Sequence, residues 1–161
     1  MRFAIGCDHA GFPLKAGAAE LLAALGHSVE DLGTDSTAPV DYPDYARAVA
    51  VAVVSGKADR GLVLCGSGVG ASVAASKVPG ARAALCHDVF SARQGVEDDD
   101  MNVLCLGARV IGPALAAEVI RAFAGARFSG ADRHVRRLGK VMAIENDARR
   151  GAFDNPKTPG G

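Results

Sequence analysis

The chain has 161 residues, the length of a single domain, with 49% hydrophobic and 22% charged residues and a formal net charge of zero. A balanced charge gives no general attraction to nucleic acid or to a membrane surface, and no apolar run approaches the roughly 18 residues of a membrane span. No signal-peptide pattern precedes the first strand-like segment. We therefore expect a cytoplasmic protein that binds neither nucleic acid nor membrane.

Strand-like and helical segments alternate along the chain. Strands are expected near residues 3–7, 28–32, 61–65, 83–86 and 103–106, and helices near 13–25, 45–55, 71–77, 89–95, 113–124 and 132–149. Strict alternation with short connections predicts an α/β fold, a Rossmann-like three-layer α/β/α sandwich with a five-stranded parallel sheet. Residues 1–150 are expected to form one domain, and the Gly/Pro-rich segment 151–161 a disordered tail.

The four cysteines give no sign of disulfides or of a metal site. Each lies at or near the end of an apolar run, and none belongs to a C-x-x-C pair: they are Cys7, Cys65, Cys86 and Cys105. Such cysteines are typical of reduced thiols in a parallel sheet. The turn at residues 6–11 lacks the G-x-G-x-x-G spacing, which argues against a dinucleotide cofactor.

The segment 62–72 reads LVLCGSGVGAS, an apolar strand that ends on Cys65, followed by a glycine-rich turn and a helix. The backbone N–H groups of such a turn can hold an anion at a helix N-terminus. A thiol beside them should be partly ionised, and the same amides can stabilise negative charge on a substrate. The segment favours an enzyme acting on a carbonyl compound, although by itself it leaves open an inert, packed thiol.

Ligands of doubly wound folds bind beyond the carboxyl ends of the strands. The polar residues expected there are Asp8, His9, Cys65 to Gly70, His87, Asp88 and Arg109. Each taken alone can be a helix cap or a polar strand end, but their convergence on one edge favours a site. The loop 33–44 is long enough to form a wall of it. Arg133 and Arg137, four residues apart, form either a phosphate-binding fork or part of a solvated basic face.

Several short motifs together resemble the ribose-5-phosphate isomerase B family, which includes the galactose-6-phosphate isomerase subunits. They are G-C-D-H-A-G-F at 6–12, D-Y-P at 41–43, C-G-S-G-V-G at 65–70, A-x-K-V-P-G-x-R-A at 75–83, N-V-L at 102–104, G-A-R-V-I-G at 107–112 and R-H-x-x-R at 133–137. The resemblance covers residues 2–148.

The resemblance implies an aldose–ketose isomerase of a sugar phosphate, with ribose 5-phosphate and ribulose 5-phosphate as the leading pair. Cys65 would be the base that forms a cis-enediolate, held by the Ser67 hydroxyl and the turn amides. The remaining substrate-binding positions would be Asp8, His9, Tyr42, Gly66, Gly68, Val69, Gly70, Asp99, Arg109, Arg133 and Arg137. The family needs neither metal nor organic cofactor and works as a homodimer or homotetramer with sites at the subunit interface.

One departure from the family pattern concerns the acid that opens the sugar ring. In the family this acid is usually a histidine, followed by an asparagine. Here Asp98 stands at the position of the histidine and Asp99 at that of the asparagine. Asp98 can replace the histidine if its neighbours favour its protonated form, or 97–100 can be a solvated acidic turn. A tetrose 4-phosphate cannot close a furanose ring, so a tetrose phosphate isomerase needs no such acid. A phosphosugar-binding protein without catalysis is a further alternative.

Overall fold

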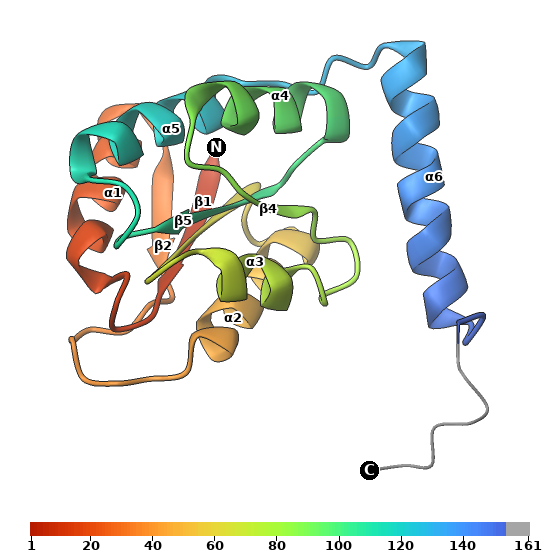
Figure 1. The fold of residues 1–161 in the computed structure, drawn as a ribbon. Helices are drawn as coiled ribbons and strands as arrows, with labels where there is room; N and C mark the ends of the chain where they lie inside the picture. The colour runs from red at the N-terminus through yellow and green to blue at the C-terminus, as the bar shows by residue number, and fades with distance from the viewer. Residues whose placement is uncertain (154–161) are drawn as a thin grey trace, which may run out of the picture. The chain divides into compact units, whose positions relative to one another are not determined.

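The computed structural model describes residues 1–153 and shows five strands and six helices in alternation (Figure 1). The strands are β1 (Arg2–Cys7), β2 (Ser28–Asp31), β3 (Arg60–Cys65), β4 (Ala83–Leu85) and β5 (Val103–Gly107). The helices are α1 (Phe12–Ala24), α2 (Tyr42–Val54), α3 (Val69–Ala75), α4 (Val89–Asp99), α5 (Pro113–Gly125) and α6 (Asp132–Arg149). Every predicted element is present.

All neighbouring strands pair in parallel, in the order β2-β1-β3-β5-β4. The three inner strands are buried along almost their whole length, whereas β2 and β4 at the edges are more exposed. Such apolar inner strands are expected where helices cover both faces of a parallel sheet. The register aligns Cys65, the last residue of β3, with Gly107, the last residue of β5.

Helices cover both faces of the sheet (Figure 1), and a hydrophobic cluster fills the space on each face. Alternate residues of the strands point to opposite faces. Ile5 and Leu64 pack with the cluster that includes α1, α4 and α5, whereas Ala4 and Val63 pack with the cluster of α2 and α3. The predicted three-layer α/β/α sandwich is therefore confirmed.

Three helix boundaries differ from the prediction, each for a local reason. Helix α2 begins at Tyr42 rather than near residue 45, because Pro43 has the backbone angle that a first helical turn requires. Helix α3 begins at Val69, directly after Gly68, whose φ of 80° is accessible to glycine. Helix α4 continues to Asp99 before a left-handed residue, Asp100, ends it. Tyr42 is therefore the first helical residue and not part of a loop.

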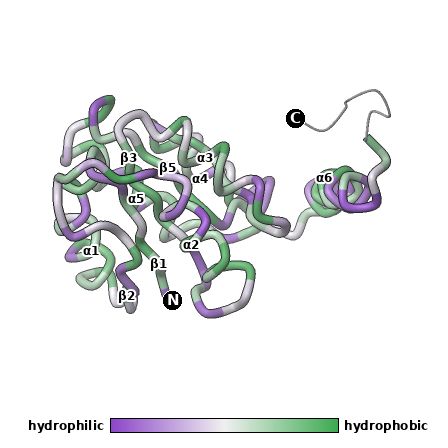
Figure 2. Tube along the Cα trace, turned by 90° about the horizontal axis from the view of Figure 1, so that it is seen from below, coloured by the Kyte–Doolittle hydropathy of each residue, from purple (hydrophilic) through white to green (hydrophobic). Residues whose placement is uncertain are grey.

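The chain divides into two compact units, the first comprising Met1–Phe128 and the second beginning at Ser129. The second unit contains α6, along which apolar and hydrophilic positions are interspersed (Figure 2). Val135, Val141 and Ile144 on this helix are all more than half exposed. Of the segment expected to be a disordered tail, residues 154–161 lie outside the described part of the chain.

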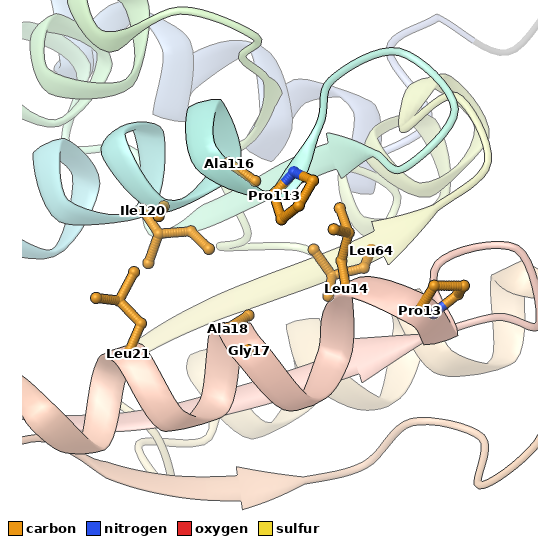
Figure 3. Close-up of a pocket in the computed structure, with 10 residues that line it drawn as sticks. Pro13, Leu14, Gly17, Ala18, Leu21, Leu64, Pro113, Ala116 and Ile120 are labelled. Carbon is orange, nitrogen blue, oxygen red and sulfur yellow. The ribbon is translucent and has the colours of Figure 1, made fainter.

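A small apolar hollow of about 120 Å³ lies between α1 and α5 (Figure 3). Leu14 and Leu21 from α1 face Ala116 and Ile120 from α5 across it, and Gly17 lies on its α1 side. Only apolar side chains and glycine line the hollow, so it contains no acid, base or nucleophile. The hollow therefore offers no group for acid–base or nucleophilic chemistry.

Candidate active site

An open cavity of about 340 Å³ lies at the carboxyl edge of the sheet, between the ends of β1 and β3. The chain leaves β1 toward α1 on one face of the sheet and leaves β3 toward α3 on the other (Figure 1). Loops diverge at such a switch point and open a crevice between them. The cavity is lined by Asp8, His9, Ala10, Tyr42, Cys65, Gly66, Ser67, Gly70, Arg109 and Val110.

Cys65 ends β3 on the floor of this cavity, with 4% of its surface exposed. The backbone N–H of Gly68 donates a hydrogen bond to the Cys65 sulfur over 3.0 Å. Gly68 precedes α3 in a left-handed conformation, which turns this N–H back toward the thiol. The N–H of Val69 donates to the Ser67 hydroxyl oxygen over 3.3 Å. Backbone N–H groups of the turn therefore hold both the Cys65 thiol and the Ser67 hydroxyl.

All four cysteines are buried in the hydrophobic core, but Cys7, Cys86 and Cys105, unlike Cys65, do not line the cavity. Burial raises the pKa of the Cys7 and Cys86 thiols to about 11, and it raises the pKa of Cys105 further. All four cysteines are free thiols. Cys65 is therefore the cysteine that borders the cavity, and the one placed to react with a ligand.

Tyr42 covers the turn from the α2 side. A Cβ atom on Gly70 would lie 2.7 Å from the Tyr42 ring, so only glycine allows the ring its position over the first turn of α3. Tyr42 is 40% exposed and lines the cavity. The phenol therefore lies beside the glycine-rich turn, within reach of a ligand in the cavity.

Asp8 follows β1 and is held in one orientation. Its Oδ1 accepts hydrogen bonds from the N–H groups of Ala10 at 2.9 Å and Gly11 at 2.8 Å. Asp8 is only 6% exposed yet borders the cavity. Because two amides fix Oδ1, the direction of Oδ2 is fixed as well, which suits a carboxylate that orients hydroxyl groups.

His9 links the cavity to the loop between β2 and α2. The N–H of Val40 donates to Nδ1 of His9 over 3.2 Å. Since Nδ1 accepts, the proton of the neutral imidazole lies on Nε2, which is thus a hydrogen-bond donor. The loop is also held at Thr34, whose carbonyl accepts from Lys15 Nζ over 2.7 Å. The loop therefore borders the site, and His9 presents a donor suited to an anion.

Arg109 comes from the segment that follows β5. The N–H of Ala108 donates to the Cys65 carbonyl at 2.8 Å, and the N–H of Arg109 donates to the Gly66 carbonyl at 3.0 Å. The backbone pairing of β3 and β5 thus continues past the strand ends and carries the arginine to the cavity. A neighbouring cavity of about 580 Å³ shares His9, Ala10 and Arg109 with it. The two polar side chains border both spaces, where they can bind a phosphate group.

Asp98 and Asp99 do not join this site within one chain. They end α4, which runs opposite to the strands and leads into the first residue of β5. Cys65 is aligned with the last residue of β5, and the five residues of that strand extend about 16 Å. The Asp98 carboxylate accepts a hydrogen bond from the Gln94 amide at 2.8 Å. The two aspartates therefore lie near the amino-terminal end of β5, at the edge of the sheet opposite to its carboxyl edge.

Arg133 and Arg137 belong to α6 in the second unit and are described within it. Arg133 Nε donates to Nε2 of the buried His134 over 2.9 Å, and Nδ1 of that histidine is bonded to the Ser129 hydroxyl at 2.7 Å. Arg133 therefore interacts with the residue that follows it in the R-H-x-x-R motif.

Two cavity residues, Ala10 and Val110, were not predicted from the sequence. Neither has a side chain whose chemistry signals a site. Two glycines in the same loops do carry a signal: a Cβ on Gly11 would lie 2.1 Å from the Leu64 carbonyl oxygen, and one on Gly107 would lie 2.5 Å from that of Ser67. These close approaches bring the loops together around Cys65.

No helix in residues 1–153 combines the length and apolar character needed to cross a bilayer. Within the same residues, no cluster of three or more His, Cys, Asp or Glu side chains could hold a metal ion. The fold and the cavity thus define a parallel α/β protein with a thiol beside amide donors, a carboxylate, an imidazole and a guanidinium at its switch point.

Comparison with known proteins agrees with this class. The model of the Ribose/Galactose Isomerase family matches residues 3–141. Ribose-5-phosphate isomerase B of Escherichia coli is 44% identical over 144 residues, which are 89% of this chain and 96% of that protein. D-erythrulose-4-phosphate isomerase of Pectobacterium atrosepticum is 44% identical over 132 residues, 81% of this chain and 86% of that protein.

Among solved structures, that of Clostridium thermocellum ribose-5-phosphate isomerase B has a TM-score of 0.89 with 46% sequence identity. The match covers 92% of this chain and 99% of that one. The chain belongs to the ribose/galactose isomerase family, as its motifs led us to expect, and it is a sugar phosphate isomerase of the aldose–ketose type.

Proposed function

We propose that this enzyme interconverts ribose 5-phosphate and ribulose 5-phosphate through a cis-enediolate, with Cys65 as the base. The observation that supports this most directly is the position of the Cys65 sulfur, which borders the cavity and accepts the N–H of Gly68 at 3.0 Å. A thiolate held by an amide in a cavity is suited to proton transfer at carbon.

In the proposed reaction the Cys65 thiolate takes the proton from C2 of the open-chain aldose, and the electron pair moves onto the carbonyl oxygen at C1. The turn amides and the Ser67 hydroxyl stabilise the resulting enediolate. The thiol then returns the proton to C1, while the proton of the C2 hydroxyl passes to O1. Atoms and electrons balance without an oxidant, which fits a chain whose motifs call for no cofactor.

The side chains around Cys65 divide the remaining tasks. His9 and Arg109 bind the phosphate, with Arg133 and Arg137 completing the set. The turn residues Gly66, Gly68, Val69 and Gly70 lie beside the enediolate oxygens, with the Gly68 N–H on the Cys65 sulfur and the Val69 N–H on the Ser67 hydroxyl oxygen. Asp8 and Tyr42 orient the sugar hydroxyls. The closeness of Asp8, His9, Tyr42 and Arg109 to Cys65 around one cavity supports this division.

We further propose that a second copy of the chain completes each site. Asp98 and Asp99 lie at the far edge of the sheet from Cys65, so a single chain does not bring them to the reacting carbons. A homodimer in which the second copy supplies the two aspartates together with Arg133 and Arg137 removes this separation. The exposed apolar residues on α6 supply surface for such an interface.

Co-assembly of two inactive variants tests this dimer. Cys65→Ala and Arg137→Ala chains, mixed after reversible denaturation, are expected to recover about a quarter of native activity, since half of the dimers are hybrids with one intact site. Each variant refolded alone is the control. Without recovery in the mixture, the cysteine and the arginine of one site would have to come from the same chain.

A second candidate substrate is a tetrose phosphate. Asp98 replaces the histidine expected to open a furanose ring, and a relative with 44% identity is named D-erythrulose-4-phosphate isomerase. Tetrose 4-phosphates are never furanoses, so their isomerisation needs no ring opening. The pentose remains our first choice because a protonated aspartate can also donate to a ring oxygen.

Parallel steady-state assays on ribose 5-phosphate and erythrose 4-phosphate distinguish the two substrates. We expect turnover of the pentose, and Asp98→His is expected to raise kcat on it by about tenfold, because an imidazole titrates near neutral pH. Its kcat on the tetrose should not change. Native activity on the tetrose alone would contradict the first proposal and support the second.

A further inference from the structure

Strands β4 and β5 end at different heights at the carboxyl edge of the sheet. The N–H of Cys86 donates to the Cys105 carbonyl at 3.3 Å, which is the last backbone bond between the two chain segments. The next group on that side of β5 is the N–H of Gly107. It donates to Nε2 of the His87 imidazole at 3.0 Å. The side chain of His87 therefore takes the place of a missing strand carbonyl.

The peptide between Leu106 and Gly107 also supports the turn that follows Cys65. A Cβ atom on Gly68 would lie 2.9 Å from the carbonyl carbon of Leu106 and 3.1 Å from the Gly107 nitrogen. A Cβ on Gly107 would lie within 2.9 Å of three backbone atoms of Ser67. The Ser67–Gly68 turn thus rests directly on this peptide. Tilting the peptide displaces the turn.

We propose that His87 is a positioning residue for the isomerase reaction. Its Nε2 fixes the Leu106–Gly107 peptide, which supports the turn and so directs the Gly68 N–H toward the Cys65 sulfur. An acceptor at Nε2 requires the neutral imidazole with its proton on Nδ1. The proposal rests on the proposed role of Cys65 as the base, but His87 itself does not line the cavity.

Two substitutions at His87 distinguish the effect of its hydrogen-bond acceptor, Nε2, from the effect of the size of the side chain. His87→Leu removes the acceptor, and we expect kcat to fall by at least about tenfold on the sugar phosphate that the enzyme turns over, because small displacements of transition-state donors are costly. KM should change by less than about threefold, since His9 and Arg109 still bind the phosphate. His87→Gln offers an amide oxygen at a similar reach and is expected to keep most of kcat.

Asp88→Ala is the matched control. Asp88 is the next residue; it was expected at the site but does not line the cavity. Its Oδ1 also accepts a backbone N–H, that of Ser91 at 2.7 Å, but this bond caps α4. Its loss weakens the fold in the same region without touching Gly107. We expect native kcat for this variant below its unfolding temperature. If His87→Leu has native kcat, or if His87→Gln loses as much as His87→Leu, the proposal is overturned.

Alkylation of Cys65 provides a readout independent of turnover. Iodoacetamide reacts with thiolates, and peptide mass spectrometry identifies the modified cysteine. At pH 7.5 we expect His87→Leu to react at Cys65 at least about fivefold more slowly than the native protein, with His87→Gln and Asp88→Ala near the native rate. Equal rates in all four proteins would refute the positioning role. Should Cys65→Ala remain an active isomerase, the proposed function fails while this comparison still tests His87.

Discussion

Replacing Cys65 by alanine is expected to lower kcat for the sugar phosphate by at least about a thousandfold, because the group that moves the proton between carbons is lost. Binding should change little, with a Kd within about threefold of native, since the phosphate and hydroxyl contacts come from other residues. Coupled spectrophotometry measures kcat, and calorimetric titration measures Kd. Retained turnover would exclude Cys65 as the base.

Cys7→Ala provides the control for the loss of a thiol as such. Cys7 ends β1 as Cys65 ends β3, but it is fully buried against Thr34, and burial raises its pKa to about 11. We expect this variant to be less stable by about 1 kcal/mol, as is usual for a small core truncation, yet to keep native kcat. A large loss of kcat in both variants would show that the assay reports folding rather than chemistry.

Replacing Gly11 by alanine is expected to be the most disruptive single methyl addition near the site. Its Cβ would lie 2.1 Å from the Leu64 carbonyl oxygen and 2.8 Å from the Cys65 nitrogen, and neither backbone atom can move without displacing β3. We expect the free energy of unfolding to fall by about 3 kcal/mol, the upper range for overpacking. Activity should fall as well, because Gly11 holds Asp8 beside Cys65. Urea denaturation measures the first effect.

Gly17→Ala, within α1, the helix that Gly11 directly precedes, is the matched control. No atom lies within 4 Å of the Cβ position at Gly17, which borders the hollow between α1 and α5 (Figure 3). Alanine favours a helix interior over glycine by about 0.5–1 kcal/mol, so this variant should be more stable than the native protein. Equal destabilisation by both substitutions would mean that close contact at Gly11 is not the cause.

The fold could be predicted because its determinants are local. Alternation of apolar strands with helical segments identified all five strands, and short helical connections between them imply that the strands run parallel. The start of α2 was missed although Pro43 signals a first helical turn. Had that proline been weighted more heavily, Tyr42 would have been placed on the helix that carries it into the cavity.

The rest of the site could not be predicted because it depends on tertiary geometry. The sequence shows that Asp98 follows the helical segment, but only the paired strands show that it lies at the opposite edge from Cys65. In the same way, a histidine after β4 has many possible partners, and the bond to Gly107 arises only because β4 is shorter than β5. Neither the position of Asp98 nor the partner of His87 is indicated by a periodic pattern in the sequence.

The cavity draws its residues from the whole first unit, from Asp8 after β1 to Val110 after β5. Pairing strands so distant along the chain is slow, because the chain loses conformational entropy on loop closure before the strand contacts stabilise the fold. No fragment that lacks β1 or β5 can therefore assemble the cavity. During refolding, the native reactivity of the Cys65 thiol should accordingly appear late, at the same time as hydrogen-exchange protection of the amides in the central strands. The rate at which it appears would therefore report when the sheet is complete.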